Sequence, residues 1–501
     1  MKKKQLILSL TALALVIAVL IAAFVIKGRE KPVPPSPLTV SASGLKAEGS
    51  AVVLKNTAYT ENEKLTYTLY APKEYFNLGG GAALNPHGTC GGFGCTGAPI
   101  LIFPDMKESP EEYIKEGFVV VYPKITAEDE LLAVTQLKAV VRHLRYNRTS
   151  LAGCTARIFV IAENEAAGAA AALGASGSSA LYNSELSRIG AVMSDSYGVP
   201  IGDSVAGVLC SNPKTCKDVS NLSYEWSTGQ FTEAQGRDKD SYRSLLSKDL
   251  AEQYGEFINK INIKNPEGLS LKLQKENGAY LKGSYYDYIM LQINGSLNNY
   301  LKAKGISLKK FAKSHNVKVE GDGVKYESLE AFTKDYITPS REVAAVQPDY
   351  YTASLLRDNS SRYGKYKDFD KKLYLKYEKA LLEKDEHGFT ARDRCNMVNP
   401  MYFLSAYYLG YTKSTPAKHW LITNRIDSGE VSLTDAVNLK LLLTRSPYVD
   451  TAALQMKWDE EKPDGEKIRE FVRTSCTSLG EKDEELRQQS SPDFSNPFKK
   501  D

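Results

Sequence analysis

The sequence predicts an α/β fold in which a mostly parallel, doubly wound sheet carries a large, mainly helical insertion. Short apolar runs bounded by turn residues, such as Pro99–Phe103 and Gly117–Tyr122, are too short for helices and typical of buried parallel strands. A helical pattern spans Leu131–Tyr146, and alternation of strands with helices favours a parallel sheet. This alternation stops over residues 201–415 and then resumes. The interruption predicts an insertion between strands of one sheet.

The expected elements follow in order along the chain. Two strands with alternating apolar residues, Ala51–Leu54 and Lys64–Tyr70, precede a glycine-rich loop at Gly79–Gly97. Residues 201–415 are rich in tyrosine and lysine and mostly helical in pattern, and we interpret them as a cap; an independent domain is the alternative. The later core elements expected are strands Arg157–Ala162, Ile189–Met193, His419–Thr423 and Thr451–Lys457, and an amphipathic segment at Thr434–Thr444.

The N-terminal segment predicts a membrane anchor. Three lysines precede an uncharged apolar run, Leu6–Ile26, and roughly 20 apolar residues are enough for a helix to cross a bilayer. A cleaved signal peptide usually has a shorter run with a small-x-small site at its end, whereas Ala12-Leu-Ala14 comes too early to be cut. We therefore expect an uncleaved signal-anchor, with the lysines in the cytoplasm and the rest of the chain outside. A cleaved segment would instead make the protein secreted.

These features divide the chain into consecutive parts. Residues 1–26 are the cytoplasmic stub and transmembrane signal-anchor, and residues 27–45 are a proline-rich tether. The α/β core is expected at residues 46–200 and 416–480, with the cap at 201–415 and a polar tail at 481–501. The net charge of +4 is spread over the chain and gives no case for nucleic acid as a partner.

The chain has seven cysteines, and outside the cytoplasm close pairs of cysteines are typical of disulfides. The candidate pairs are Cys90–Cys95 and Cys210–Cys216, and the odd count leaves at least one thiol over. A four-cysteine zinc site is the rival interpretation, but the spacing is looser than in zinc ribbons. We therefore expect no metal and no cofactor.

The segment Ile158–Gly177 carries the most information about chemistry. It runs from an apolar strand through a sharp turn into a helix of small residues, which is where an α/β-hydrolase carries its nucleophile. Asn164 occupies the position expected for serine, and Ala162 and Ala166 stand where glycines are expected. An amide has neither hydroxyl nor thiol, so acyl transfer lacks an attacking atom here. The sequence thus predicts a nucleophile elbow without its nucleophile.

An ordered series of segments over residues 50–475 resembles the bacterial tannases and the related feruloyl-esterase-like α/β-hydrolases. Leu137–Asn147 is similar to the family's helix before the elbow strand, and Ala166–Gly177 is similar to the helix after it. The resemblance implies an α/β-hydrolase fold, and it implies that Asp358 and Asn359 face the aromatic ring of a substrate. Similar segments in the cap are Ser223–Trp226, Gly283–Tyr288, Asp358–Gly364 and Asn399–Met401.

The family's catalytic pattern is not kept. Its elbow, Gly-x-Ser-Ala-Gly, corresponds here to Ala162–Ala166, and the resemblance places the acid at Asp427 and the histidine at or near Lys462. The turn expected to form the oxyanion hole is Pro104–Ser109, which is bulky and charged. In this fold the histidine follows the acid along the chain, yet every histidine of this sequence precedes Asp427: His87, His143, His315, His387 and His419.

Two functions are compatible with this pattern. The first is a catalytically inactive ectodomain. It would bind an aromatic or phenolic ligand, a cell-wall glycan or a surface protein at the cleft that corresponds to the family's active site, or it would serve only as a structural module. The second is an active carboxylic-ester hydrolase of unusual design, with Glu163 or Glu165 as base or covalent carboxylate near Asp427 and Lys462. However, Asp427 and Lys462 can simply pair as ions, and acids at a helix N-terminus are favoured by the helix dipole. The sequence therefore favours the inactive ectodomain.

Overall fold

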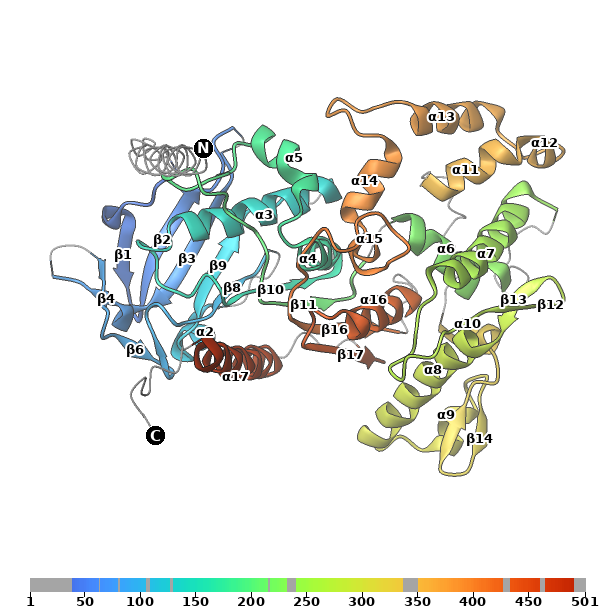
Figure 1. Cartoon of the computed structure of the whole chain (residues 1–501). Coiled ribbons are helices and arrows are strands. Elements are labelled where there is room, and N and C mark those ends of the chain that lie inside the picture. The colour runs from blue at the N-terminus through green and yellow to red at the C-terminus, as the bar shows by residue number, and fades with distance from the viewer. Residues whose placement is uncertain are drawn as a thin grey trace, which may run out of the picture.

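A nine-stranded sheet forms the centre of the molecule (Figure 1). The computed structural model of the chain describes residues 38–62, 64–79, 82–104, 109–126, 129–214, 217–231, 240–336, 350–426, 433–459 and 465–490. Every neighbouring pair of strands from β9 to β17 is parallel, and β1, β2 and β3 add an antiparallel edge. The sheet order is β1 (Leu45–Glu48), β2 (Ala51–Ala58), β3 (Thr66–Pro72), β9 (Val119–Pro123), β8 (Ile100–Ile102), β10 (Ile158–Glu163), β11 (Gly207–Ser211), β16 (His419–Arg425) and β17 (Thr451–Lys457).

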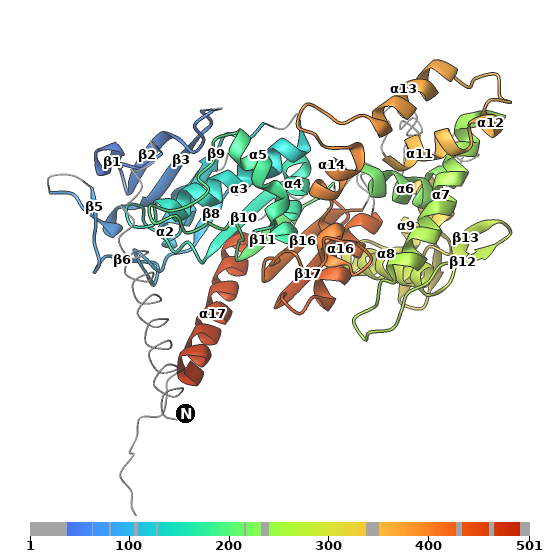
Figure 2. The ribbon, with the colours of Figure 1, turned by 45° about the horizontal axis from the view of Figure 1, so that its top comes forward.

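Different helices cover the two faces of this sheet, because successive side chains of a strand point to opposite sides. Val160 and Ala162 of β10 belong to the core shared with α3, α4 and α16. Phe159 and Ile161 point the other way, into a smaller core with α2 and α17 (Figures 1 and 2). The predicted doubly wound architecture is therefore confirmed. The helices are α2 (Glu111–Lys115), α3 (Glu130–Tyr146), α4 (Asn164–Ser176), α5 (Asn183–Arg188), α16 (Leu433–Arg445) and α17 (Gly465–Ser490).

A mainly helical cap is inserted between β11 and β16, and it lies at one end of the sheet in both ribbon views. Two small hairpins accompany its helices: β12–β13 (Gln274–Glu276 and Ala279–Lys282) and β14–β15 (Lys318–Glu320 and Gly323–Lys325). The cap helices are α6 (Lys217–Ser227), α7 (Tyr242–Ile261), α8 (Ser284–Ala303), α9 (Leu308–Ala312), α10 (Leu329–Tyr336), α11 (Tyr350–Asp358), α12 (Ser360–Tyr363), α13 (Lys371–Leu382), α14 (Ala391–Val398) and α15 (Pro400–Leu404).

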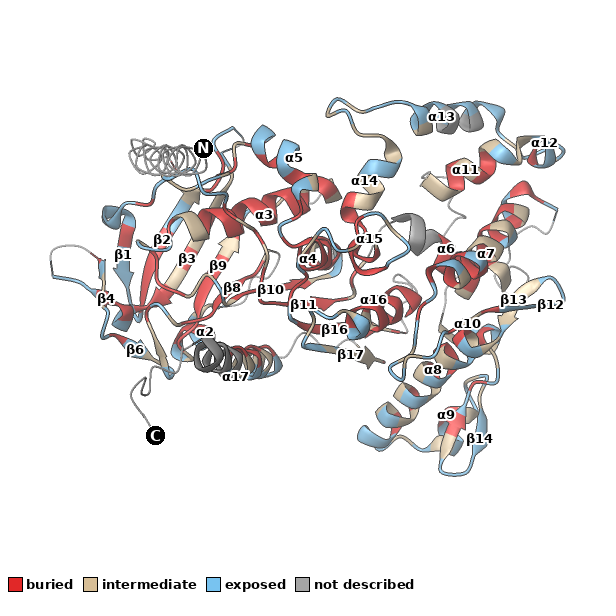
Figure 3. Ribbon diagram, in the orientation of Figure 1, coloured by how far each residue is buried: buried red, intermediate tan, exposed pale blue. Residues whose placement is uncertain are grey.

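Buried hydrogen bonds fasten the cap to helix α16 of the core. Asn438 donates to the Tyr254 hydroxyl (3.0 Å) and accepts from the Tyr285 hydroxyl (2.7 Å), and the two hydroxyls lie 2.7 Å apart. These bonds close a ring among α7, α8 and α16, where the side chains are buried (Figure 3). Ser223 of α6 adds a hydrogen bond to Asp435 (2.9 Å). Since buried polar groups are costly without partners, this network specifies one position of the cap.

The glycine-rich loop of the core folds into two further hairpins, β4–β5 (Phe76–Asn77 and Ala83–Leu84) and β6–β7 (Thr89–Cys90 and Phe93–Gly94). The predicted Cys90–Cys95 disulfide is not formed, and both cysteines are free thiols. Cys90 points toward the Ile114 carbonyl oxygen, which accepts from its thiol at 3.5 Å, whereas Cys95 is buried in the core. The two side chains therefore have different surroundings although they are close in sequence.

One predicted strand of the central sheet is wrong, and two of its strands, β1 and β11, were not predicted. The segment Ile189–Met193 is not a strand: Gly190 adopts φ +71° and the Ala191 amide bonds the Leu186 carbonyl, so this segment ends helix α5. The strand at this place in the sheet is β11, which lies between β10 and β16. The core sheet thus includes a segment that the sequence assigned to the cap.

The predicted membrane-spanning segment, Leu6–Ile26, lies outside the described residues, as does the tether up to Pro37. Among the helices of the described ranges, none is long and apolar enough to cross a membrane.

Candidate functional site

The turn between β10 and α4 has the geometry of a nucleophile elbow. β10 ends at Glu163 and α4 begins at Asn164, whose φ of +47° lies in the left-handed region. Among residues other than glycine, asparagine is one of the few that adopt this region readily. The predicted location of Asn164, at the sharp strand-to-helix turn, is confirmed. Its side chain is exposed at the carboxyl edge of the sheet.

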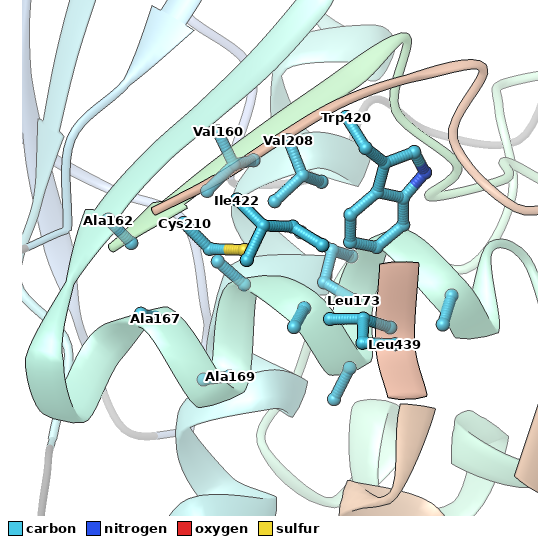
Figure 4. Packing of buried hydrophobic residues seen from close by; sticks show 14 of the residues in the cluster. Val160, Ala162, Ala167, Ala169, Leu173, Val208, Cys210, Trp420, Ile422 and Leu439 are labelled. Carbon is cyan, nitrogen blue, oxygen red and sulfur yellow. The ribbon is translucent and has the colours of Figure 1, made fainter. Parts of the chain in front are cut away.

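Close packing of α4 on the sheet holds this turn in place. A Cβ atom on Gly174 would lie 2.5 Å from Val208 and 2.7 Å from the ring of Trp420, and one on Gly168 would lie 2.2 Å from the Lys214 carbonyl oxygen. Figure 4 shows Val208 and Trp420 facing the small side chains of α4. The alanine- and glycine-rich sequence of α4 is therefore required for the helix to approach the strands.

Asparagines stand at the carboxyl ends of three adjacent strands, and we call Asn164, Asn212 and Asn424 the asparagine row. The Asn212 amide nitrogen donates to Asn164 Oδ1 over 3.4 Å, and the Asn212 Oδ1 accepts from the Arg425 amide over 2.6 Å. Asn212 also has a positive φ, +53°, and its own amide bonds the Thr423 carbonyl oxygen. Asn212 thus links the elbow to the end of β16.

Asn424 is the inner member of the asparagine row. It is fully buried, and neither its Oδ1 nor its Nδ2 has a hydrogen-bond partner. Asn424 lies two residues after Ile422. In the register of the sheet, Ile422 is the neighbour of Cys210 on β11, and Cys210 is the neighbour of Ala162 on β10. The alternation of strand side chains puts Asn424 on the sheet face of Ile422, which is the face that α4 covers.

The acidic groups at the elbow are only partly described. Glu163, the last residue of β10, is half-buried and precedes the first turn of α4 without capping it through a hydrogen bond. The side chain of Glu165, Asp427 and Lys462 lie outside the described part of the chain, so the proposed ion pair of the last two stays a prediction. The same holds for most of the expected oxyanion turn, since residues 105–108 are not described.

No described histidine lies at the elbow. His419 begins β16, at the opposite edge of the sheet, and bonds Thr451 over 3.0 Å; six strand residues separate the edges by about 20 Å. His143 is buried on α3, His315 stacks on a cap phenylalanine, and His387 lies near acids at the α13–α14 junction. The fifth, His87, is exposed in the loop before β6. A general base must therefore come from another residue type.

The structure does not bring Asp358 and Asn359 to the elbow. Asp358 is exposed and pairs with its neighbour Arg357 at 2.8 Å. Asn359 bonds the Leu355 carbonyl at 3.2 Å and precedes helix α12. Figures 1 and 2 place α12 at the far end of the cap from α4. The predicted contact with a substrate ring is therefore not supported by the position of these residues.

The predicted Cys210–Cys216 pair lies only partly within the described residues. Cys210 is buried in β11 as a free thiol, where burial raises its pKa to about 12, and its predicted partner Cys216 is outside the described ranges. No group of three or more potential metal ligands is clustered within the described residues.

Asn212 and Asn424 were not predicted as site residues from the sequence. Asn212 follows β11, which was not predicted, and Asn424 follows directly on the predicted end of its strand at Thr423. A signal was present, since each asparagine comes at the end of a short apolar run. Only the order of the strands in the sheet shows that the two runs are neighbours of the elbow strand.

Comparison with solved structures gives the same fold. A tannase from Lactobacillus plantarum matches with a TM-score of 0.66 at 20% identity, over 88% of this chain and 99% of that one. The tannase of Fusobacterium nucleatum matches with a TM-score of 0.63 at 19% identity, over 88% and 99% of the two chains. The predicted tannase-like α/β-hydrolase fold is confirmed. No protein-family model and no curated protein sequence matches the chain.

Ligands are present in two of the similar structures, both of tannin acyl hydrolase at 19% identity. One is a complex with ethyl gallate, with a TM-score of 0.63, and the other a complex with 3,4-dihydroxybenzoate, with a TM-score of 0.65. Both matches cover 88% of this chain.

Proposed function

We propose that this protein has a tannase-like hydrolase fold that no longer hydrolyses esters and instead binds a small aromatic or phenolic ligand at the elbow. The observation that carries the proposal is Asn164: it occupies the strained turn of a nucleophile, at φ +47°, with a side chain that cannot attack a carbonyl. The sequence supports it independently, because no histidine follows Asp427. The ligand class is taken from the aromatic acyl compounds bound in similar structures.

The proposed place of action is the outer side of the cell membrane. The uncharged run Leu6–Ile26 and the three lysines before it support a single-pass anchor with the domain outside. Alkaline extraction tests the anchor, since an integral protein stays in the membrane pellet. Release of the domain into the medium, with a new N-terminus after the apolar run, would instead establish cleavage.

A second candidate function is ester hydrolysis by a carboxylate at the elbow. Its supporting observation is Glu163, which is half-buried at the end of β10 and adjacent to the elbow residue. A buried carboxylate can act as base or nucleophile when its environment tunes its pKa. We rank this function below ligand binding, because the acid would have to replace both the serine and the histidine.

Hydrolysis of ethyl 3,4-dihydroxybenzoate by the purified full-length chain in detergent separates the two functions. We expect no release of ethanol above buffer from the natural protein or from Asn164→Ala. Turnover that Glu163→Gln abolishes would establish the carboxylate mechanism. Turnover that Asn164→Ala abolishes would show that the asparagine is not an inert replacement.

Ligand binding is measured on the same protein by calorimetry with 3,4-dihydroxybenzoate and its derivatives. We expect saturable binding that is weakened by Asn164→Trp, since a bulky side chain at the elbow fills the space above the strand ends. Absence of binding by every aromatic acyl compound would overturn the ligand assignment and leave a structural module.

A further inference from the structure

Near the elbow, the side-chain amide of Asn424 is buried without hydrogen bonds, which lowers the stability of the folded protein. A buried amide that loses its bonds to water costs about 1–3 kcal/mol per unsatisfied group, and native proteins avoid this by supplying a protein, water or ligand partner. Asn424 is 0% exposed, and both its donor and its acceptor lack partners. An apolar side chain of the same size would be more stable here if nothing ever bound this amide.

The position of Asn424 connects it to the start of helix α4. Asn212 donates to Asn164 over 3.4 Å and accepts from the Arg425 backbone amide over 2.6 Å, so hydrogen bonds join Asn164, Asn212 and the backbone that follows Asn424. Exposure falls along the row, from exposed Asn164 through partly exposed Asn212 to buried Asn424. The first amides of α4, a helix of 13 residues, are also available at its outer end because a helix leaves its first N–H groups unbonded.

We infer that the asparagine row recognises a carboxamide, so that the ligand at the elbow is a primary amide of an aromatic acid and not its ester or its carboxylate. The inference rests on the proposed function, because it names the acyl group of the ligand that the elbow binds. The ligand enters beside Asn164, and its amide group pairs with the amide of Asn424 at the inner end.

Hydrogen-bonding capacity distinguishes the three acyl groups. The amide of Asn424 offers two N–H donors and an acceptor oxygen side by side. A primary carboxamide presents the same two kinds of group and satisfies both atoms through a pair of parallel hydrogen bonds. An ester has no donor and leaves Asn424 Oδ1 unsatisfied, which is the kind of mismatch that gives strong discrimination.

A carboxylate is disfavoured for two reasons, its lack of a donor and its charge. It also lacks a donor, and it brings a negative charge to a place flanked in sequence by Glu163 and Glu165. The helix dipole of α4 partly offsets this repulsion, but it does not supply the missing donor for Asn424 Oδ1. The row therefore selects a neutral amide over an anion.

Calorimetry with three matched compounds on the full-length chain in detergent tests the inference. These are 3,4-dihydroxybenzamide, ethyl 3,4-dihydroxybenzoate and 3,4-dihydroxybenzoate, which share one ring and differ in the acyl group. We expect the amide to bind at least tenfold more tightly than the other two. Asn424→Leu is expected to remove this preference by weakening amide binding at least tenfold while changing ester binding less than twofold.

Two further variants keep the test independent of folding defects. Asn212→Gly removes the linking side chain but tolerates the positive φ at this position, and it is expected to reduce the amide preference. Met456→Leu changes the β17 residue paired with Asn424 and leaves the row intact, so it is expected to bind like the natural protein.

The remaining outcomes separate the inference from the proposed function. Equal binding of all three compounds, or an amide preference that survives Asn424→Leu, would overturn amide recognition while leaving an aromatic binding site. If no aromatic compound binds, ligand-observed NMR with acetamide decides: a signal that Asn424→Leu abolishes supports amide recognition without the aromatic ligand. No such signal would overturn both, with a buried water as the partner of Asn424.

Discussion

The Nε2 atom of His143 lies 2.8 Å from the carbonyl oxygen of Leu38. Since the carbonyl accepts, Nε2 carries the proton, and Nδ1 accepts from the Tyr67 hydroxyl at 3.1 Å. Asn147, the residue that follows α3, binds the same stretch by donating to the Leu38 carbonyl oxygen and accepting from the Val40 amide. The first described residues of the chain are therefore fixed to α3 by a buried, neutral histidine.

The stability of the protein is expected to fall as the pH falls from about 6.5 to 4. Burial lowers the pKa of His143 to about 4, from 6.5. The unfolded chain then binds a proton that the folded chain does not, so unfolding becomes easier on acidification, by up to about 3 kcal/mol below pH 4. Urea unfolding at pH 7 and pH 4.5 measures this change. His143→Gln, which keeps a donor but does not titrate, is expected to show a smaller pH dependence, and an unchanged slope would contradict the assignment.

Gly174→Ala is expected to destabilise the fold although alanine is the better helix former. Its Cβ atom would lie 2.5 Å from Val208 and 2.7 Å from Trp420, and overpacking of this kind costs about 1–3 kcal/mol. Gly295→Ala in α8 is the matched control, because nothing other than its chain neighbours and the nearby backbone of its own helix lies within 4 Å of its Cβ position. The control should gain about 0.5–1 kcal/mol from helix propensity. Chemical denaturation measures the unfolding free energy of both variants. A change of the same sign in Gly174→Ala and Gly295→Ala would contradict the role assigned to close packing.

Asp203→Asn is expected to cost about 3–5 kcal/mol of unfolding free energy. Asp203 is completely buried and bonds both Lys138 (2.8 Å) and Arg142 (2.7 Å), which are buried as well. Removal of the carboxylate charge leaves two cations in the interior without compensation. The exposed pair of Glu48 and Lys55 provides the contrast, because Glu48→Gln should leave the denaturation midpoint unchanged.

Asn164→Ser alone is expected not to restore ester hydrolysis. The serine hydroxyl would stand at the elbow, but a serine is a weak nucleophile without an adjacent base, and no described histidine reaches this edge of the sheet. The measurement is release of alcohol from ethyl 3,4-dihydroxybenzoate, with binding of the same ester as the control for an intact site. Turnover in this variant would reveal a base already present, and Glu163 would be the first residue to test.

The sequence was sufficient for those parts of the fold in which local pattern and tertiary packing agree. β10 and α4 were predictable because an apolar strand is followed by a helix of alanine and glycine, and this composition also permits the close approach of α4 to the sheet. The segment Ile189–Met193 misled because its apolar composition is that of a strand, whereas Gly190 and Ala191 terminate a helix. Apolar composition does not distinguish a strand from the end of a helix. Here the hydrogen bond from the Ala191 amide to the Leu186 carbonyl oxygen makes the segment a helix end.

The candidate site was predictable only at its first residue. Asn164 could be found from one continuous segment, because the elbow is a local turn. The other members of the asparagine row come from strands separated by the whole cap, and their proximity depends on the order β10-β11-β16. The partnerless state of Asn424 is a property of its buried surroundings and could not be inferred from residue type.

The packing of Trp420 against Gly174 makes this residue an optical probe of α4, at the end of the helix away from Asn164. Its indole donates to the Ala417 carbonyl at 2.8 Å, and its ring lies where a side chain on Gly174 would be. The other two tryptophans lie elsewhere: Trp226 is inside the cap beside Tyr254, and Trp458, after β17, makes an edge-to-face contact with Tyr336. Replacing Trp226 and Trp458 by phenylalanine would leave one emitter, whose fluorescence reports on the helix that carries Asn164 without an added label.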